Sequence, residues 1–295
     1  MRMTSSPTGP FSTSGKSAPN RPARRANAPT RVITVTSGKG GVGKSSLVLN
    51  AAVSLAQMKN KVLILDADMG LSNIDILAGI ATRHNLSHVL ANEKLLTSVI
   101  AEGPAGIHLL PAASGVEWVT NLTSEQKLDF LQKMDELNGL YDILLIDTGA
   151  GISSNVLYFN LAAQVRIVVV TPEPTSLTDA YALIKVLHRS YHQKNFEVVV
   201  NLVQSEKEGL DVYRNLTAVA DRFLEVRLGY LGCIRQDGRL GQAVLRQTPV
   251  VEMFPDTAVS QDYRAVARKI LQLRADVTDS DLGLFWRKVF EPSQT

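Results

Sequence analysis

Short apolar runs alternate along the chain with longer segments whose apolar residues recur at helical spacing. Several of the short runs are apolar on both faces, which is typical of strands buried in a parallel sheet. The predicted strands are residues 32–36, 62–65, 107–110, 143–146, 165–170, 198–202 and 226–231. The predicted helices are residues 45–58, 124–137, 177–192, 211–223 and 257–274. This alternation predicts an α/β fold with one doubly wound, mostly parallel sheet and helices on both faces.

The two ends of the chain differ from this central part. Residues 1–31 are rich in Ser and Pro and carry six basic side chains and no acid, so they predict a disordered basic arm. The formal net charge of the whole chain is +3, and because the arm contributes six positive charges, the remaining residues carry a net charge of about −3. We expect one domain over residues 32–275, followed by a linker and an amphipathic helix over residues 276–295.

Composition excludes several classes of protein. No run approaches the roughly 18 apolar residues that a membrane-spanning helix needs, and the N-terminus lacks the apolar region of a secretory signal. Cys233 is the single cysteine, so the chain offers neither an internal disulfide nor the paired cysteines of an iron–sulfur carrier. These features predict a protein of the reducing cytoplasm.

A glycine-rich segment joins the first predicted strand to the first predicted helix. Residues 38–45, Gly-Lys-Gly-Gly-Val-Gly-Lys-Ser, match the pattern G-x-x-x-x-G-K-[ST] in the context that it requires. Its glycines let backbone N–H groups turn toward the β- and γ-phosphates, where the helix N-terminus adds positive charge. Lys44 supplies charge to the same oxygens, and Ser45 can hold Mg²⁺. The predicted nucleotide-binding residues are Gly38, Lys39, Gly40, Gly41, Val42, Gly43, Lys44, Ser45 and Ser46.

Lys39 is a second lysine at the start of this loop. The form Lys-Gly-Gly-x-Gly-Lys resembles the deviant Walker A signature of the MinD/ParA group, which are P-loop NTPases of the SIMIBI class. In that group the matching lysine reaches the nucleotide of the partner subunit, and the ATP-bound form is a dimer. A cation delivered in this way stabilises charge on the transferring phosphoryl group, as an arginine finger does. The resemblance implies an ATP-dependent homodimer, with Lys39 and Lys44 both catalytic and with ATP and Mg²⁺ as cofactors.

Three aspartates follow two of the buried strands. Asp66 and Asp68 follow one strand, and Asp147 ends another, just before residues 148–151. Ligands bind at the carboxyl ends of parallel strands, although an aspartate there can also cap a helix. The resemblance implies that Asp68 polarises the attacking water, that Asp66 supports it, and that residues 148–151 sense the γ-phosphate. It also implies that Asp147 reaches Mg²⁺ through a water, with Ser45 and Asp68 beside the metal.

Two later residues are candidates for contact with the base. In the family that the chain resembles, an Asn at the position of Asn201 reads adenine. No N-K-x-D motif is present, which favours ATP over GTP. Arg235 lies in the loop that is also near the base, at a place where the family usually has proline.

Three segments, residues 111–115, 147–152 and 173–185, look like the FlhG/FleN proteins, which are MinD-like regulators of flagellar number. The resemblance implies a slow, Mg-dependent ATPase that is stimulated by partners and membrane. It implies as partners an FlhF-type GTPase, a flagellar master transcription activator of the FleQ/FlrA type and components of the flagellar C-ring. Residues 1–31 lack the D-Q-A-x-x-L-R helix of many members, which argues against direct stimulation of the GTPase.

The C-terminal segment forms an apolar helix face. Its apolar residues fall on one helical side and are Leu282, Phe285, Trp286, Val289 and Phe290. Arg287 and Lys288 are available to anionic lipid. Members of the family use such a helix for ATP-dependent binding to the inner face of the cytoplasmic membrane. The same face could instead dock in a groove on its own body, or ATP could choose between the two positions.

Two other functions fit the same nucleotide site. One is a Min-type division-site selector, and the other is a ParA-type ATPase that positions DNA or cargo. We expect no direct contact with nucleic acid, because the body of the chain is mildly acidic. Lys39 argues against a metabolic ligase of this fold, because a lysine at this position serves a nucleotide held between two subunits.

Overall fold

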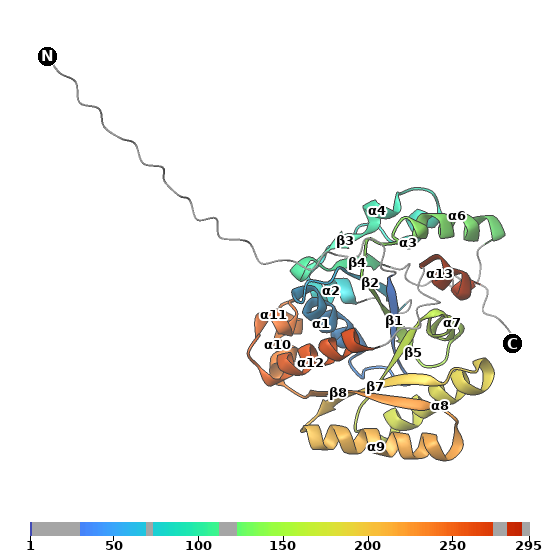
Figure 1. The fold of residues 1–295 in the computed structure, drawn as a ribbon, viewed down its shortest axis with the longest axis vertical. Coiled ribbons are helices and arrows are strands. Elements are labelled where there is room, and N and C mark those ends of the chain that lie inside the picture. The colour runs from blue at the N-terminus through green and yellow to red at the C-terminus, as the bar shows by residue number, and fades with distance from the viewer. Residues whose placement is uncertain (2–29, 69–72, 112–122, 274–281, 291–295) are drawn as a thin grey trace.

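An eight-stranded sheet forms the centre of the molecule (Figure 1). The structure is a computed structural model, and it describes residues 1, 30–68, 73–111, 123–273 and 282–290. The strand order is β3-β4-β2-β5-β1-β6-β7-β8, and every pairing is parallel except that of β3 with β4. The strands are β1 (Arg31–Ser37), β2 (Val62–Ala67), β3 (Ala101–Glu102), β4 (His108–Pro111), β5 (Ile143–Ala150), β6 (Val165–Val170), β7 (Asn195–Val203) and β8 (Arg227–Arg235). The predicted doubly wound, mostly parallel α/β fold is confirmed.

Helices cover both faces of the sheet, because successive residues of each strand point to opposite sides. One core cluster packs strand residues such as Ile33 and Val35 against α1 (Lys44–Gln57), α11 (Val250–Met253) and α12 (Ala258–Gln272). Across the sheet, α6 (Ser124–Asp135) and α7 (Ser154–Ala162) belong to a second cluster, and α8 (Pro174–Tyr191) and α9 (Glu206–Phe223) to a third. The described residues before position 274 also form α2 (Ile74–Ala78), α3 (Leu86–Leu90), α4 (Leu96–Val99) and α10 (Gly238–Leu245), and a 3₁₀ turn, η1, covers Pro104–Gly106.

The last described helix, α13 (Leu282–Phe290), packs on the body between α6 and α7 (Figure 1). All five residues of its predicted apolar face are buried. Trp286 lies edge-on to Phe130 of α6, with ring centroids 4.9 Å apart, and to Phe159 of α7, with centroids 6.2 Å apart. The structure therefore shows the docked position, one of the arrangements that the sequence left open.

The other terminal predictions fall mostly on residues that the structure does not describe. These are residues 2–29 of the arm and residues 274–281 of the linker. The final body helix, α12, ends at Gln272 rather than at residue 274. None of the described helices is both long enough and apolar enough to cross a membrane.

Candidate nucleotide site

The glycine loop lies at the carboxyl end of the central strand β1 and leads directly into α1. Gly41 and Gly43 adopt φ angles of 78° and 89°, in the left-handed region that glycine tolerates. A side chain at Gly43 would place its Cβ 2.2 Å from Nδ2 of Asn201, and one at Gly38 would lie 2.1 Å from the backbone of Asp179 in α8. Glycine is therefore required here both for backbone geometry and for close packing.

The start of α1 is suited to an anion. Gly43 precedes the helix without a side-chain cap, and no acidic residue lies in the first turn. The first N–H groups of a helix lack partners within it and carry partial positive charge. Lys44, buried to 7% exposure, adds a full charge at this end of the helix. Phosphate is the ligand that such an arrangement fits best.

Two aspartates lie side by side at the adjoining edge of the sheet. Asp66 of β2 and Asp147 of β5 are direct neighbours in the parallel register, and each is 1% exposed. Burial, and then the charge of Asp66, raise the pKa of Asp147 to about 7, against the opposing effect of its hydrogen bond with Ser45 and the charge of Lys44. The carboxylate of Asp147 is therefore poised to ionise when a cation arrives.

The residues around Asp147 fit Mg²⁺. Its Oδ1 atom is buried and has no hydrogen-bond partner among the described residues. No group of three His, Cys, Asp or Glu side chains in the described part of the chain is arranged to hold a metal alone. Mg²⁺ commonly keeps several waters and takes one or two protein oxygens together with substrate phosphates. Ser45 and Asp147 provide such oxygens, and the cation would bring charge to the phosphates that Lys44 faces.

Asp66 organises the turn that carries Asp68. The carboxylate of Asp66 accepts hydrogen bonds from the backbone N–H groups of Asp68, Asn73 and Ile74, at 3.3, 3.2 and 3.2 Å. It thereby holds the end of β2 to the start of α2. Asp68 lies across from the loop after β5, with Oδ1 3.5 Å from the position of a Cβ on Gly149. The structure brings Asp66, Asp68 and Asp147 together, while their roles in hydrolysis remain predictions.

The predicted switch after Asp147 is joined to β1. The Thr148 hydroxyl donates to the carbonyl of Val35 at 3.1 Å, and the N–H of Gly151 donates to the carbonyl of Ser37 at 2.9 Å. A movement of residues 148–151 would therefore also displace β1, the strand that leads into the phosphate loop.

Asn201 contacts the phosphate loop itself. Its Nδ2 donates to the carbonyl of Val42 at 2.7 Å, and its Oδ1 accepts from the N–H of Leu202 at 2.9 Å. Leu202 has a φ of 59°, in the left-handed region that side chains other than Gly seldom adopt. In this structure both ends of the Asn201 amide are used by the backbone, so recognition of adenine by this residue remains a prediction.

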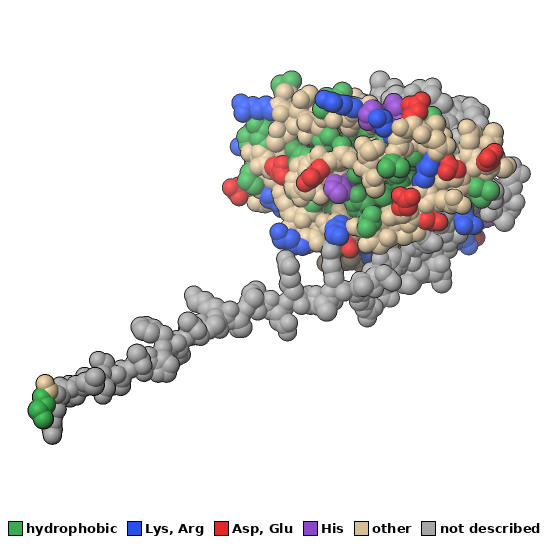
Figure 2. Space-filling model, turned by 90° about the horizontal axis from the view of Figure 1, so that it is seen from above, with side chains coloured by type: hydrophobic (Ala, Val, Ile, Leu, Met, Phe, Trp, Pro, Cys, Tyr) green, Lys and Arg blue, Asp and Glu red, His purple; other side chains and the backbone are tan. Residues whose placement is uncertain are grey.

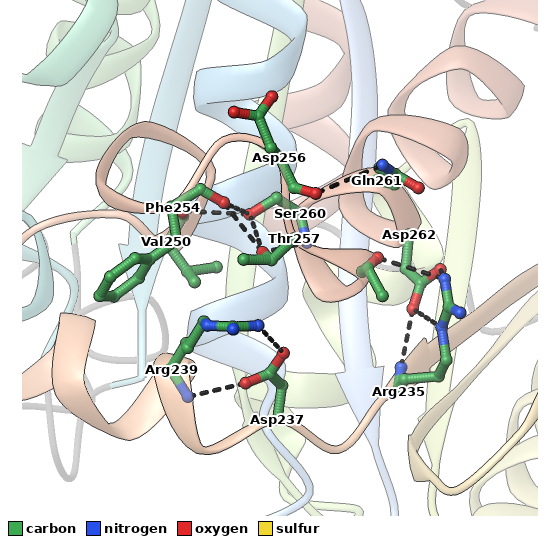
Figure 3. A network of polar contacts seen from close by, with 11 residues as sticks. Arg235, Asp237, Arg239, Val250, Phe254, Asp256, Thr257, Ser260, Gln261 and Asp262 are labelled. Carbon is green, nitrogen blue, oxygen red and sulfur yellow. Dashed lines mark hydrogen bonds and ion pairs between the residues drawn. The ribbon is translucent and has the colours of Figure 1, made fainter.

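Arg235 is engaged with α12 instead of projecting freely toward a base (Figure 3). Its guanidinium donates to both carboxylate oxygens of Asp262, at 2.8 and 2.7 Å, and its backbone N–H donates to the same group. The pKa of Arg235 is raised by this pairing. The ion pair accounts structurally for arginine at this position, and the expected contact with nucleotide remains a prediction.

Lys39 is held by residues that the sequence did not assign to the site. Its ammonium forms an ion pair with Glu173 and a 3.0 Å hydrogen bond with the hydroxyl of Thr175, both at the start of α8. The lysine side chain is 37% exposed, so it lies at the surface of the loop. Both residues lie at the start of segment 173–185, which resembles the FlhG/FleN proteins. That resemblance was the one indication in the sequence that Glu173 and Thr175 belong near the site.

Comparisons with known proteins agree with this fold and with a nucleotide-binding protein. A family model described as "ParA: NUBPL iron-transfer P-loop NTPase" matches residues 28–271. The antiactivator FleN of Pseudomonas aeruginosa is 42% identical over 82% of this chain and 86% of its own length. The flagellum site-determining protein YlxH of Helicobacter pylori is 36% identical, over 81% of each chain. MinD of Pyrococcus horikoshii, solved with Mg-ADP, has a TM-score of 0.63 at 25% identity and covers 82% of this chain and 96% of its own.

The fold and the phosphate loop, together with these matches, show that the chain belongs to the ParA family of P-loop NTPases and is built like MinD. Within that family it is of the FlhG/FleN type. The iron transfer named in the family description has no counterpart in paired cysteines, because the whole chain contains a single Cys.

Proposed function

We propose that this protein is an ATP-hydrolysing switch that dimerises on ATP and controls the number or placement of flagella. Flagellar control is supported by the similarity to YlxH, whose name states that it determines the site of the flagellum, and by the FlhG/FleN type of the chain. The proposed ATP-dependent switching is supported by the phosphate loop and by the aspartates at the ends of β2 and β5. Hydrolysis is expected to be slow, because its product is a change of assembly.

The position of Lys39 is the observation that carries the dimer proposal. In the single chain this lysine pairs with Glu173 at the surface, while Lys44 is buried at the start of α1. The two lysines of one loop therefore lie in different environments. A surface lysine at the edge of the phosphate site is suited to reach a second nucleotide across an interface, where its charge would stabilise the transition state.

We further propose that ATP releases α13 for membrane binding. The five buried side chains of α13 are apolar, and two cationic residues, Arg287 and Lys288, accompany them. A helix of nine residues binds lipid weakly as a single copy, so the two copies of a dimer would act together. The dimer would then work at the inner face of the cytoplasmic membrane, and the ADP form would return to the cytoplasm.

The proposed partners are those of the FlhG/FleN group. The protein would restrain a flagellar master transcription activator, a role supported by the similarity to FleN, whose name calls it an antiactivator. It would also act with an FlhF-type GTPase and with components of the C-ring.

The test of the switch is the mass of two variants by light scattering with Mg-ATP. Asp68→Ala should bind ATP and remain dimeric because hydrolysis is blocked, whereas Lys44→Gln should stay monomeric. The same mass for both variants with ATP would contradict the switch.

Flagellar count and cell length in a strain lacking the gene then test the biological role. Extra or misplaced flagella on normally dividing cells would support it. Minicells with normal flagella would favour a Min-type selector, as the MinD-like fold allows. Salt-sensitive, ATP-dependent binding to nonspecific DNA would favour a ParA-type role. Basic and acidic side chains are interspersed on the face shown in Figure 2, which gives that last role no support there.

A further inference from the structure

A cationic cavity lies on the α7 and α8 side of the sheet, near the start of β6 and β7. Its volume is about 370 Å³. It is bounded by the end of α7, the start of β6, the turn between α8 and β7, and the docked α13. The strand starts lie at the edge of the sheet opposite to the strand ends that carry the phosphate loop, so this cavity is separate from the nucleotide site.

The charged lining of this cavity is of one sign. Arg166, Lys194 and Lys288 line it together with His192, and no Asp or Glu is among its described lining residues. An adjoining cavity of about 350 Å³ shares Gln164, Arg166 and Asn195 with it. That cavity is also lined by one carboxylate, Glu197, and by Arg227. The acidic residue thus lines the neighbouring cavity, where burial raises the pKa of Glu197 and the charges of Arg227 and Lys269 oppose that shift.

Arg166 gives the cavity a fixed, buried charge. It is 8% exposed, and its Nε and Nη2 donate to the carbonyls of Asn160 and Ala163 at 2.6 and 2.8 Å. Nη2 also donates to the carbonyl of Leu161 at 3.3 Å, and among the described residues the guanidinium forms no ion pair with a carboxylate. Burial lowers the pKa of Arg166 to about 10, so the group remains protonated at neutral pH. A buried cation held only by carbonyl dipoles has capacity left for an anion.

We propose that this cavity binds a phosphoryl anion, either a free phosphorylated small molecule or a lipid headgroup. Guanidinium and ammonium groups converging on one space are the groups that proteins use for phosphate, since each forms charge-assisted hydrogen bonds with its oxygens. The adjacent uncharged amide of Asn195 supplies further donors, whereas the amide of Gln193 donates to the carbonyl of Tyr191 at 3.2 Å.

Occupancy of the cavity would hold α13 in its docked position. Lys288 belongs to α13, whereas Arg166 and Lys194 belong to the body, so the full set of cations exists only when the helix is docked. A ligand that binds one of two states better shifts the population toward that state. This coupling rests on the proposed release of α13, but the binding site itself does not.

The binding test uses inorganic phosphate and the full chain, saturated with Mg-ADP so that the phosphate loop is occupied. Titration calorimetry at constant ionic strength, set with chloride, should show saturable binding of one phosphate per chain. Lys288→Gln and Lys194→Gln should each raise Kd about tenfold, since each removes one charge-assisted bond. The matched controls are Arg287→Gln, exposed on the same helix, and Lys185→Gln, exposed on α8, and each should change Kd less than twofold.

Absence of saturable binding would overturn the proposal, and so would an Arg287→Gln variant that loses as much affinity as Lys288→Gln. Sedimentation of the ADP-loaded chain with phosphatidylglycerol vesicles, weakened by Lys194→Gln and not by Lys185→Gln, identifies a lipid headgroup as the source. No sedimentation together with phosphate binding identifies a free ligand. Because binding is measured in the ADP form, a chain that binds phosphate but fails to dimerise on ATP would refute the proposed function and leave this site standing.

Coupling is measured with ATP and the same vesicles. Saturating phosphate should reduce the ATP-dependent sedimentation of the wild type and should have less than half that effect on Lys288→Gln. Equal effects on both proteins would refute the coupling.

Discussion

Asp66 and Asp147 show how the pairing of two strands creates chemistry at a single residue. Each lies at the end of a hydrophobic strand, where a lone carboxylate would be unremarkable. The parallel register makes them neighbours, and burial together with like charge raises the pKa of Asp147 to about 7. This arrangement destabilises the ion-free protein at neutral pH, and a bound cation would relieve the effect.

We therefore predict that Asp147→Asn stabilises the protein without Mg²⁺ or nucleotide, in a pH-dependent way. A carboxyl whose folded pKa is raised holds its proton more tightly in the folded state, so its contribution to the unfolding free energy falls as pH rises from about 4 to about 7. The variant lacks this loss, and its advantage should grow to at most about 4 kcal/mol above pH 7. Urea unfolding with a chelator at pH 5 and pH 8 measures it. An advantage of equal size at both pH values would contradict the assignment, and Asp256→Asn, at an exposed position, is the control.

Mutations of Lys39 and of Lys44 should have different effects on ATP turnover and on nucleotide affinity. Lys39 is a surface residue paired with Glu173, whereas Lys44 is buried beside the phosphate site. Lys39→Ala should lower ATP turnover at least about a hundredfold while leaving the affinity for ATP within about threefold. Lys44→Gln should lose nucleotide binding itself. Fluorescent-nucleotide titration and phosphate release measure the two effects. Equal loss of affinity in both variants would mean that Lys39 serves the nucleotide of its own chain.

At the scale of elements, the docking of α13 has a small net free energy, because two large contributions nearly cancel. Burial of its five apolar side chains is worth about 10 kcal/mol, at roughly 2 kcal/mol each. Ordering its nine residues costs about 10 kcal/mol, at slightly more than 1 kcal/mol each. A helix so balanced can leave its groove without unfolding the domain.

Phe130→Ala should therefore favour the release of α13 without altering the helix itself. Phe130 belongs to α6 and contacts Trp286 and Phe290, so its removal weakens the groove by about 3 kcal/mol. Sedimentation with anionic vesicles in the absence of ATP should rise about tenfold or more. Phe223→Ala, on the exposed side of α9, is the control. Unchanged sedimentation of Phe130→Ala would show that docking does not restrain membrane binding, and deletion of residues 281–295 should abolish the signal in either protein.

Most of the longer elements were predictable from the sequence, and most of the short helices were not. The nine-residue α7 was missed as well, because its apolar residues do not keep to one helical side. Strands such as β6 are recognisable as apolar runs, and helices such as α1 are long enough for apolar residues to recur at helical spacing. The two-residue β3 and the helices α2, α3, α4, α10 and α11, none longer than eight residues, exist because neighbouring elements hold them, and they show no period of their own. The phosphate loop and the aspartates followed from motif and strand context. The partners of Lys39 and Arg235 did not, because Glu173 and Asp262 reach them only through the fold.

At the scale of the whole molecule, the proposed dimer can be tested by mixing inactive chains. In a heterodimer of Lys39→Ala with Asp68→Ala, one site keeps its own Asp68 and receives Lys39 from the other subunit. Since half the dimers in an equal mixture are mixed and half their sites are complete, roughly a quarter of wild-type turnover should return. A mixture as inactive as its components would exclude delivery of the lysine across the interface. As a control, mixing either variant with Lys44→Gln should restore no turnover, because Lys44→Gln is expected to stay monomeric.

The contact between α13 and the aromatic side chains of Phe130 and Phe159 has a consequence for the life of the protein in the cell. When the helix leaves, the groove loses its cover, and α6, which packs chiefly on α13, loses its main support. An uncovered apolar groove beside a loosened helix is what proteases and chaperones recognise. A chain that fails to reach the membrane after release would then be degraded sooner than a docked one, so the abundance of the protein would follow its nucleotide state.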